Sequence, residues 1–198
     1  MVKLAIVYYS ATGTNYELAK AAQEAAVKQG AEVRLLRVKE SAPEEAIASN
    51  PAWKKHHEAA SDIKVATTED LEWADAILFG TPTRFGNAAA QLRQFIDSTG
   101  GLWSKGKLAD KAVSAFTSAQ NPHGGQEATI LSLYTTFYHW GAIIVAPGYT
   151  DPILFKAGGN PYGASATVAE DGQFDRVVLE AVKVQTLRLL DVTARLTG

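Results

Sequence analysis

The chain has 198 residues, of which 46% are hydrophobic and 20% charged, and this is typical of a soluble protein with one globular domain spanning residues 1–198. Its formal net charge of −2 disfavours a nucleic-acid partner or an anionic membrane surface, since both are bound through basic surfaces. The absence of cysteine excludes disulfides, thiolate metal sites and cysteine nucleophiles, and we expect no metal site.

Residues 3–9 form an almost continuous apolar run, which predicts a first strand buried on both faces of a parallel sheet. This run is too short for a membrane span or a signal-peptide core, and no later segment approaches a spanning length. We therefore expect a cytoplasmic protein without membrane insertion. A helix is expected over 15–29, ended by Gly30, and a second strand over 32–38.

The segment 39–68 is the least regular part of the chain. A short helix is predicted around 43–48 or 52–59, and a connection of this length in a compact domain usually carries function or an interface. We expect Trp53 and Trp73 to be packing residues and not cofactor contacts, with a subunit interface as the alternative for Trp53.

Regular elements return after residue 74 and continue towards the C-terminus. Further strands are expected over 76–80, 111–116 and 142–146, and further helices over 88–98, 126–140 and 174–196. A glycine-rich excursion covers 147–172. Strands and helices thus alternate along the chain, which predicts an α/β protein with a parallel sheet and helices on both faces.

Three polar loops follow the first, third and fourth predicted strands, at residues 10–15, 81–87 and 117–125. In an open parallel sheet, ligands bind beyond the carboxyl ends of the strands, so we expect these loops to meet at one site. The third loop is a weak signal by itself and gains weight from this position.

The first loop reads SATGTN, from Ser10 to Asn15, and it lies directly before a helix. Its hydroxyls, its free backbone N–H groups and the positive end of the helix dipole point to one place, which predicts phosphate binding. A helix cap alone would explain one Ser or Thr, but not three around a glycine. The Walker A and GxGxxG patterns are absent, which disfavours a nucleoside triphosphatase and a dinucleotide-binding fold.

The second loop reads TPTRFGN and combines a stiffening proline with a permissive glycine. Pro82 limits the backbone angles of the loop, and Gly86 allows an unusual one. Such a loop can offer backbone donors and acceptors to a planar polar ring.

Longer motifs carry a family resemblance. The segments YYSATGTN, GTPTRFGN, STGGLW, GGQE and GGNPYGAS together resemble the WrbA family of flavodoxin-like NAD(P)H:quinone oxidoreductases, from residue 2 to the C-terminus. GTPTRFGN followed by STGGLW is the most specific part of this resemblance. It implies a flavodoxin-like fold whose five parallel strands lie in the order 2-1-3-4-5. It also implies a homotetramer, in which residues of neighbouring subunits approach each flavin.

The resemblance also implies which residues form the site. FMN is expected at the strand ends, in contact with Ser10, Ala11, Thr12, Gly13, Thr14, Asn15, Pro82, Thr83, Arg84, Phe85, Thr117, Ser118, Gln120, Asn121, Gly124, Gly125 and His139. The quinone pocket is expected at Phe85, Trp103 and His139, with His139 as the candidate catalytic residue. The sequence departs from the family at Thr12, where an aromatic residue linked to nicotinamide contact is usual, and in its third loop, which is richer in side chains.

The implied activity is the two-electron reduction of a quinone to a hydroquinone by NADH or NADPH. A hydride passes through N5 of FMN, and the quinone then enters the space that the nicotinamide leaves, which predicts ping-pong kinetics. Two-electron transfer also favours a role against oxidative stress. Two alternatives stay open: a flavodoxin-type one-electron carrier, which is usually shorter and more acidic, and a non-catalytic flavin-binding interaction protein.

Overall fold

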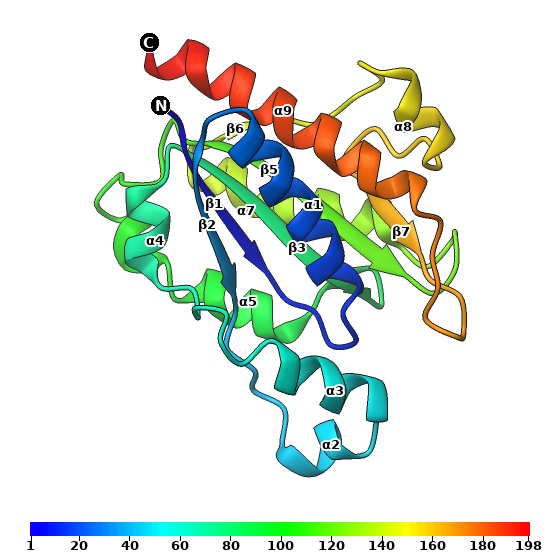
Figure 1. Cartoon of the computed structure of the whole chain (residues 1–198). Helices are drawn as coiled ribbons and strands as arrows, with labels where there is room; N and C mark the ends of the chain where they lie inside the picture. Colours follow the sequence, from blue (N-terminus) through cyan, green and yellow to red (C-terminus); the bar gives the residue numbers. More distant parts are fainter.

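Five parallel strands form the centre of the structure (Figure 1), a computed structural model that describes residues 1–198. They lie in the order β2-β1-β3-β5-β6, which confirms the predicted flavodoxin-like order. Their bounds are Lys3–Tyr8 (β1), Glu32–Arg37 (β2), Ala76–Arg84 (β3), Ala112–Ala119 (β5) and Ile143–Ile144 (β6).

Helices cover both faces of the sheet, as predicted. One face carries α1 (Thr14–Lys28), α8 (Pro152–Lys156) and α9 (Val177–Thr197). The other face carries α4 (Thr68–Trp73), α5 (Ala90–Asp97), α6 (Gly100–Trp103) and α7 (Gln126–His139). None of these helices is long and apolar enough to cross a membrane.

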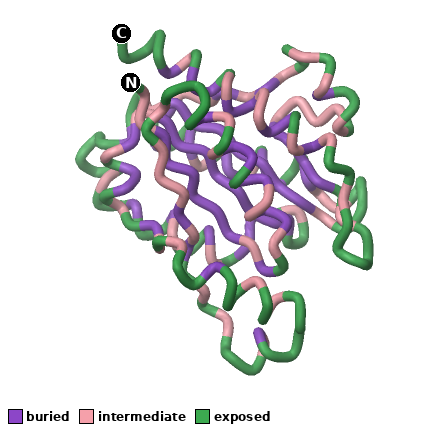
Figure 2. Tube along the Cα trace, viewed as in Figure 1, coloured by how far each residue is buried: buried purple, intermediate pink, exposed green.

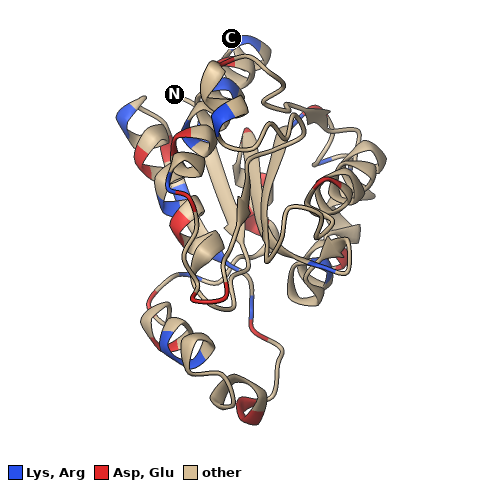
Figure 3. Ribbon diagram, turned by 90° about the vertical axis from the view of Figure 1, so that its right-hand side faces the viewer, with Lys and Arg blue, Asp and Glu red and all other residues tan.

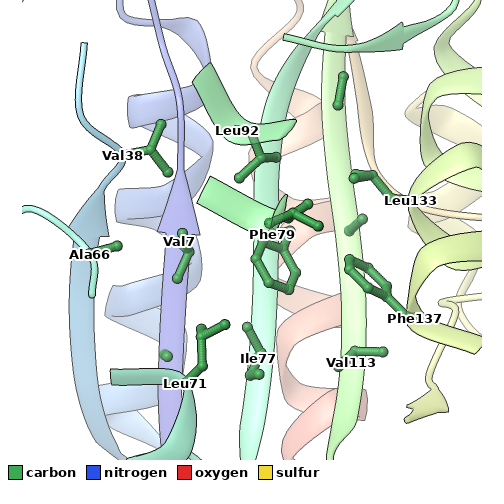
Figure 4. Close-up of a cluster of buried hydrophobic side chains, with 14 of the residues drawn as sticks. Val7, Val38, Ala66, Leu71, Ile77, Phe79, Leu92, Val113, Leu133 and Phe137 are labelled. Carbon is green, nitrogen blue, oxygen red and sulfur yellow. The ribbon is translucent and has the colours of Figure 1, made fainter. Parts of the chain in front are cut away.

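Burial on both faces explains the apolar sequences of the central strands. The buried residues run through the middle of the sheet, and exposed residues lie on the helices and outer loops (Figure 2). On the α5–α7 face, side chains of β1, β3 and β5 interlock with Leu92 and Phe137 (Figure 4). The rings of Phe79 and Phe137 stack with centroids 4.9 Å apart. This packing holds the strands in one register.

The register brings three strand ends to one edge of the sheet. Tyr8 of β1 pairs with Gly80 of β3, and β3 pairs with β5 as far as Pro82 opposite Ser118. β3 and β5 run beyond their predicted ends because their threonine-rich continuations pair with each other. A short strand β4 (Asn87–Ala88) then folds back antiparallel to β3.

The segment 39–60, which we call the α2–α3 segment, protrudes beyond this edge of the sheet (Figure 1). It contains α2 (Glu44–Ala48) and α3 (Pro51–Ala59), so helices form at both of the predicted positions. Asn50 caps α3, because its side chain accepts hydrogen bonds from the first-turn N–H groups, and Pro51 occupies the first helical position.

The predicted fifth strand is shorter than expected and is divided in two. β6 pairs with Ala112 and Val113, and β7 (Ser165–Thr167) pairs in the same direction with the end of β5. The excursion with α8 lies between these halves. Gln185 of α9 fills the gap, because its Oε1 accepts a bond from Ala164 N and its Nε2 donates to Ala115 O, both at 2.8 Å.

Candidate functional site

A cavity of about 580 Å³ lies at the strand ends, where the sequence predicts a ligand site. The predicted residues that line it are Ser10, Ala11, Thr12, Thr14, Asn15, Pro82, Thr83, Arg84, Phe85, Ser118, Gln120, Asn121 and Gly124. The structure therefore brings the three polar loops together. Ala119 and Val168 complete the lining, with Asn50 and Trp53 of the α2–α3 segment.

The first loop presents free backbone donors to this cavity. Gly13 precedes α1 with a φ of +105°, a backbone conformation that side chains with a Cβ rarely adopt. Ser10 Oγ accepts a hydrogen bond from Gly13 N at 3.1 Å. The backbone N–H groups of Thr14 and Asn15 form no hydrogen bond, as is usual for the first turn of a helix. Free donors at the positive end of a helix fit a phosphate group.

Asn15 joins the first loop to the third. Its side chain is almost fully buried, and Nδ2 donates to Ser118 Oγ at 2.9 Å. Asn15 Oδ1 is buried and has no hydrogen-bond partner. A buried acceptor without a partner is costly, so this atom fits a ligand that brings a hydroxyl or N–H donor to the cavity.

Buried threonines join the second loop to the third. Thr83 Oγ1 and Thr117 Oγ1 share a hydrogen bond of 3.0 Å, and Thr117 Oγ1 also donates to Thr81 O at 2.6 Å. Thr81 Oγ1 in turn accepts from Ala89 N at 3.0 Å. Thr117 is fully buried and does not line the cavity. Its hydrogen bonds position the two loops.

Two further predicted residues, Gly13 and Gly125, lie beside the cavity without lining it. Gly125 has a φ of +90°, and a Cβ placed on it would lie 2.8 Å from the Cα of Gly86. The second and third loops therefore touch at a pair of glycines. Only residues without a side chain allow this approach.

The second loop carries an exposed aromatic ring at the cavity. Phe85 is fully exposed, and its φ of +51° is rare for a residue with a side chain. Neighbouring Arg84 carries the only charge in the lining, and the one hydrogen bond of its side chain goes to Thr83 O at 3.2 Å. Strained backbone and an exposed ring at a cavity are typical of ligand sites.

Trp103 and His139 lie in a different pocket, of about 680 Å³, between α5, α6 and α7. Trp103 Nε1 donates to His139 O at 2.8 Å. α7 begins at the third loop and has 14 residues, so its last residue, His139, lies roughly 20 Å from its first. Within one chain the structure does not bring Trp103 and His139 to Phe85.

Glu40 is a residue of this region that the sequence did not single out. Its Oε2 accepts from Tyr9 OH at 2.9 Å and from Trp53 Nε1 at 3.2 Å. Its Oε1 accepts from Gln91 Nε2 at 2.7 Å and from two backbone N–H groups. Burial raises the pKa of Glu40, but these hydrogen bonds outweigh it and hold the pKa below its ordinary value. Burial and the bond to Glu40 raise the pKa of Tyr9.

Charged residues of both signs lie on the outer surface of the molecule (Figure 3). In the view of Figure 3, basic and acidic residues are interspersed along the helices. No group of three or more His, Asp or Glu side chains could hold a metal ion.

Comparison with known proteins gives concordant matches. Residues 2–150 match the model of a family described as NADPH-dependent FMN reductase. A relative named NAD(P)H dehydrogenase (quinone) from Deinococcus radiodurans is 55% identical over 201 residues, which cover 100% of this chain and 98% of the relative. A relative of the same name from Aromatoleum aromaticum is 43% identical and covers 98% of this chain and 97% of its own length.

The fold has a counterpart among solved structures. A WrbA-like flavodoxin from Agrobacterium tumefaciens superimposes with a TM-score of 0.69 at 21% sequence identity. The match covers 98% of this chain and 99% of that one. It shows a shared fold and confirms the flavodoxin-like architecture that the sequence predicts.

Proposed function

The chain belongs to the NADPH-dependent FMN reductase family, and from this premise we propose that it is an NAD(P)H:quinone oxidoreductase that works through FMN. The family membership confirms the predicted resemblance. The observation that carries the proposal is the cavity at the strand ends, where a helix start suited to a phosphate and the exposed ring of Phe85 share one space.

The first loop would hold the phosphate of FMN. The free N–H groups of Thr14 and Asn15 and the hydroxyls of Ser10 and Thr12 can donate to it, and no cation is needed at the positive end of α1. Asn15 Oδ1 can accept from a hydroxyl of the ribityl chain. When bound, FMN supplies the redox chemistry, taking two electrons from NAD(P)H and passing them to the quinone.

The second and third loops would orient the flavin ring. Their backbones are fixed by the Thr83–Thr117 hydrogen bond and by the glycine contact, so their N–H and C=O groups are held in place before the ligand arrives. Phe85 offers a flat apolar wall for a ring that stacks beside the flavin. The chain thus binds and orients the reactants.

We expect the nicotinamide and the quinone to use the same space in turn. The cavity of about 580 Å³ is in the range of pockets that take one cofactor-sized ligand, so we expect both rings to approach the bound flavin from its solvent side in turn. Initial rates measured over a grid of NADH and quinone concentrations should give parallel double-reciprocal lines. Intersecting lines would contradict a shared space.

The two-electron step would also support a role against oxidative stress.

The decisive experiment is purification followed by flavin analysis and turnover. The protein should carry or bind FMN and should reduce a quinone with NADH or NADPH. FMN binding without turnover would favour a non-catalytic flavin-binding protein. Accumulation of one-electron-reduced flavin in a stepwise reductive titration would favour a flavodoxin-type carrier, and no FMN binding at all would contradict the proposal.

We also propose a homotetramer in which Trp103 and His139 of one subunit reach the cavity of another. Two observations support it: these residues share a pocket that is separate from Phe85, and both Phe85 and Trp103 are exposed aromatic rings. Light scattering should give four times the mass of the chain. A monomer with full FMN content and full activity would contradict this assembly.

Trp103→Ala and His139→Ala test the quinone pocket. Each should keep FMN and lower kcat/KM for the quinone about tenfold, the scale of one lost stacking or hydrogen-bond contact. If the variants reduce the quinone with wild-type kinetics, Trp103 and His139 do not form the quinone pocket. Loss of FMN in these variants would instead assign them to the cofactor.

A further inference from the structure

Trp53 shares the strand-end cavity with the three polar loops, although it comes from α3 of the protruding segment. It is the only aromatic residue in the lining besides Phe85. The loops supply hydroxyls, amides and backbone groups, which suit the phosphate and polar edges of a ligand. An aromatic side chain in the same lining suits the flat apolar part of a ring.

Trp53 is not accounted for by packing alone. No residue of α3 is buried, and Trp53 itself is half-buried, packed on one side against the hydrophobic core cluster of the α5–α7 face. Trp53 also lines the cavity. The expectation that Trp53 is simply a packing residue is therefore incomplete.

Glu40 fixes the direction of the Trp53 ring. An indole has one polar hydrogen, and Glu40 Oε2 accepts it at 3.2 Å. The same carboxylate accepts hydrogen bonds from Tyr9, which directly follows β1, and from Gln91 at the start of α5. Glu40 thus ties Trp53 to two rigid elements of the body, which is how a side chain on an outlying helix can be held at a site.

We propose that Trp53 contacts the isoalloxazine ring of bound FMN and that Glu40 is the positioning residue for Trp53. This inference rests on the proposed function, since it assumes that the cavity holds FMN. The α2–α3 segment is then a wall of the flavin site, and its position affects the cofactor directly.

Flavin affinity of the apoprotein tests the contact. Trp53→Leu should weaken binding of FMN and of riboflavin alike, each about five- to tenfold, because both ligands carry the ring and an aromatic contact has this scale. Gly13→Val should mainly weaken FMN, since riboflavin lacks the phosphate. The fluorescence of bound flavin should also rise in Trp53→Leu, because a contacting indole quenches it.

Lys55→Leu is the matched control. Lys55 is an exposed residue of the same helix and does not line the cavity. Lys55→Leu therefore introduces the same side chain as Trp53→Leu without removing a flavin contact. This variant should bind both flavins as the wild type does. Trp53→Phe keeps a ring without the indole N–H, so it should retain affinity within about threefold and remains informative if Trp53→Leu folds poorly.

A double-mutant cycle tests the role of Glu40. Glu40→Gln should weaken FMN binding in the wild-type background and have little further effect in the Trp53→Leu background, because its contribution passes through the indole. Additive losses would show that Glu40 acts independently of Trp53 and would overturn its positioning role.

The outcomes separate this inference from the proposed function. A wild-type protein that binds no FMN contradicts the function itself. A wild-type protein that binds FMN, with a Trp53→Leu variant of unchanged affinity for both flavins, overturns the ring contact alone. A change confined to KM for NAD(P)H or for the quinone also overturns it, because the ring contacted is then that of a substrate.

Discussion

The two sides of the strand-end cavity are built in different ways. The loops after β1, β3 and β5 are fixed by the register of the sheet and by buried bonds such as Asn15–Ser118 and Thr83–Thr117. The α2–α3 segment has only Ile47 and Ala60 buried, and its ties to the body are the hydrogen bonds of Glu40, the partly buried Trp53 and the contact between the rings of His56 and Tyr16. The first side is part of the core, whereas the second can change without unfolding it.

The largest effect is expected where the two loops touch. Gly125→Ala would place a Cβ 2.8 Å from the Cα of Gly86, at a φ of +90°. Overpacking and backbone strain together should lower the free energy of unfolding by roughly 2–4 kcal/mol, measured by urea denaturation. Gly172→Ala is the control, since its φ is +84° with no atom near, and it should cost only about 1 kcal/mol. Equal losses would contradict the close contact.

The next-largest effect is expected on the retention of FMN, from a change at the start of α1. Gly13→Val forces a branched side chain into a φ of +105° and should abolish retention of FMN through purification, because the free N–H groups no longer point to one place. Gly30→Val imposes similar strain at the other end of α1, where φ is +85° and no atom is near. It should keep FMN. Full flavin content in Gly13→Val would refute the phosphate site.

A smaller, pH-dependent effect is expected on the α2–α3 side. The pKa of Glu40 is lowered in the folded protein, so its ionised form stabilises the fold above the unfolded value of about 4.3. That stabilisation is lost as pH falls through the folded pKa. The stability difference between wild type and Glu40→Gln should therefore shrink as pH falls from about 5 to about 3. A constant difference would show that the charge of Glu40 does not matter.

The smallest effect is expected on the outer surface of α3. Lys54 and Glu58 form an exposed ion pair at 3.9 Å. Lys54→Ala should change the free energy of unfolding by less than about 0.5 kcal/mol and leave FMN content unchanged, since exposed pairs contribute little. A larger loss of stability would show that this surface is covered in solution, for example by a neighbouring subunit.

The sequence predicts the loop side of the site far better than the α2–α3 side. Apolar runs at strand spacing, followed by Ser, Thr and Gly, are local signals, and they locate the loops that end in Asn15, Asn87 and Gly125. The strand order followed from the family resemblance. What a residue contacts across the fold leaves no such signal, so the sequence does not single out Glu40 and indicates for Trp53 only packing or a subunit interface.

The predicted ends of the strands are wrong where pairing between distant segments overrides the local sequence pattern. Thr81 and Thr83 look like loop residues, yet their bonds to Thr117 and Ala89 extend β3 into the site. The interruption of the fifth strand depends on Gln185, which is remote in sequence and supplies hydrogen bonds in place of a strand. The polar, glycine-rich excursion gave no sign that it would return to the sheet as β7.

The divided strand at the β6 and β7 edge also protects the protein against aggregation. A long edge strand offers a row of free N–H and C=O groups to any other chain with which it can pair. Here β6 has two residues and β7 has three, and the excursion with α8 separates them. The opposite edge, β2, carries the charged residues Glu32, Arg34 and Arg37. Neither border of the sheet is therefore a long apolar template for intermolecular strand pairing.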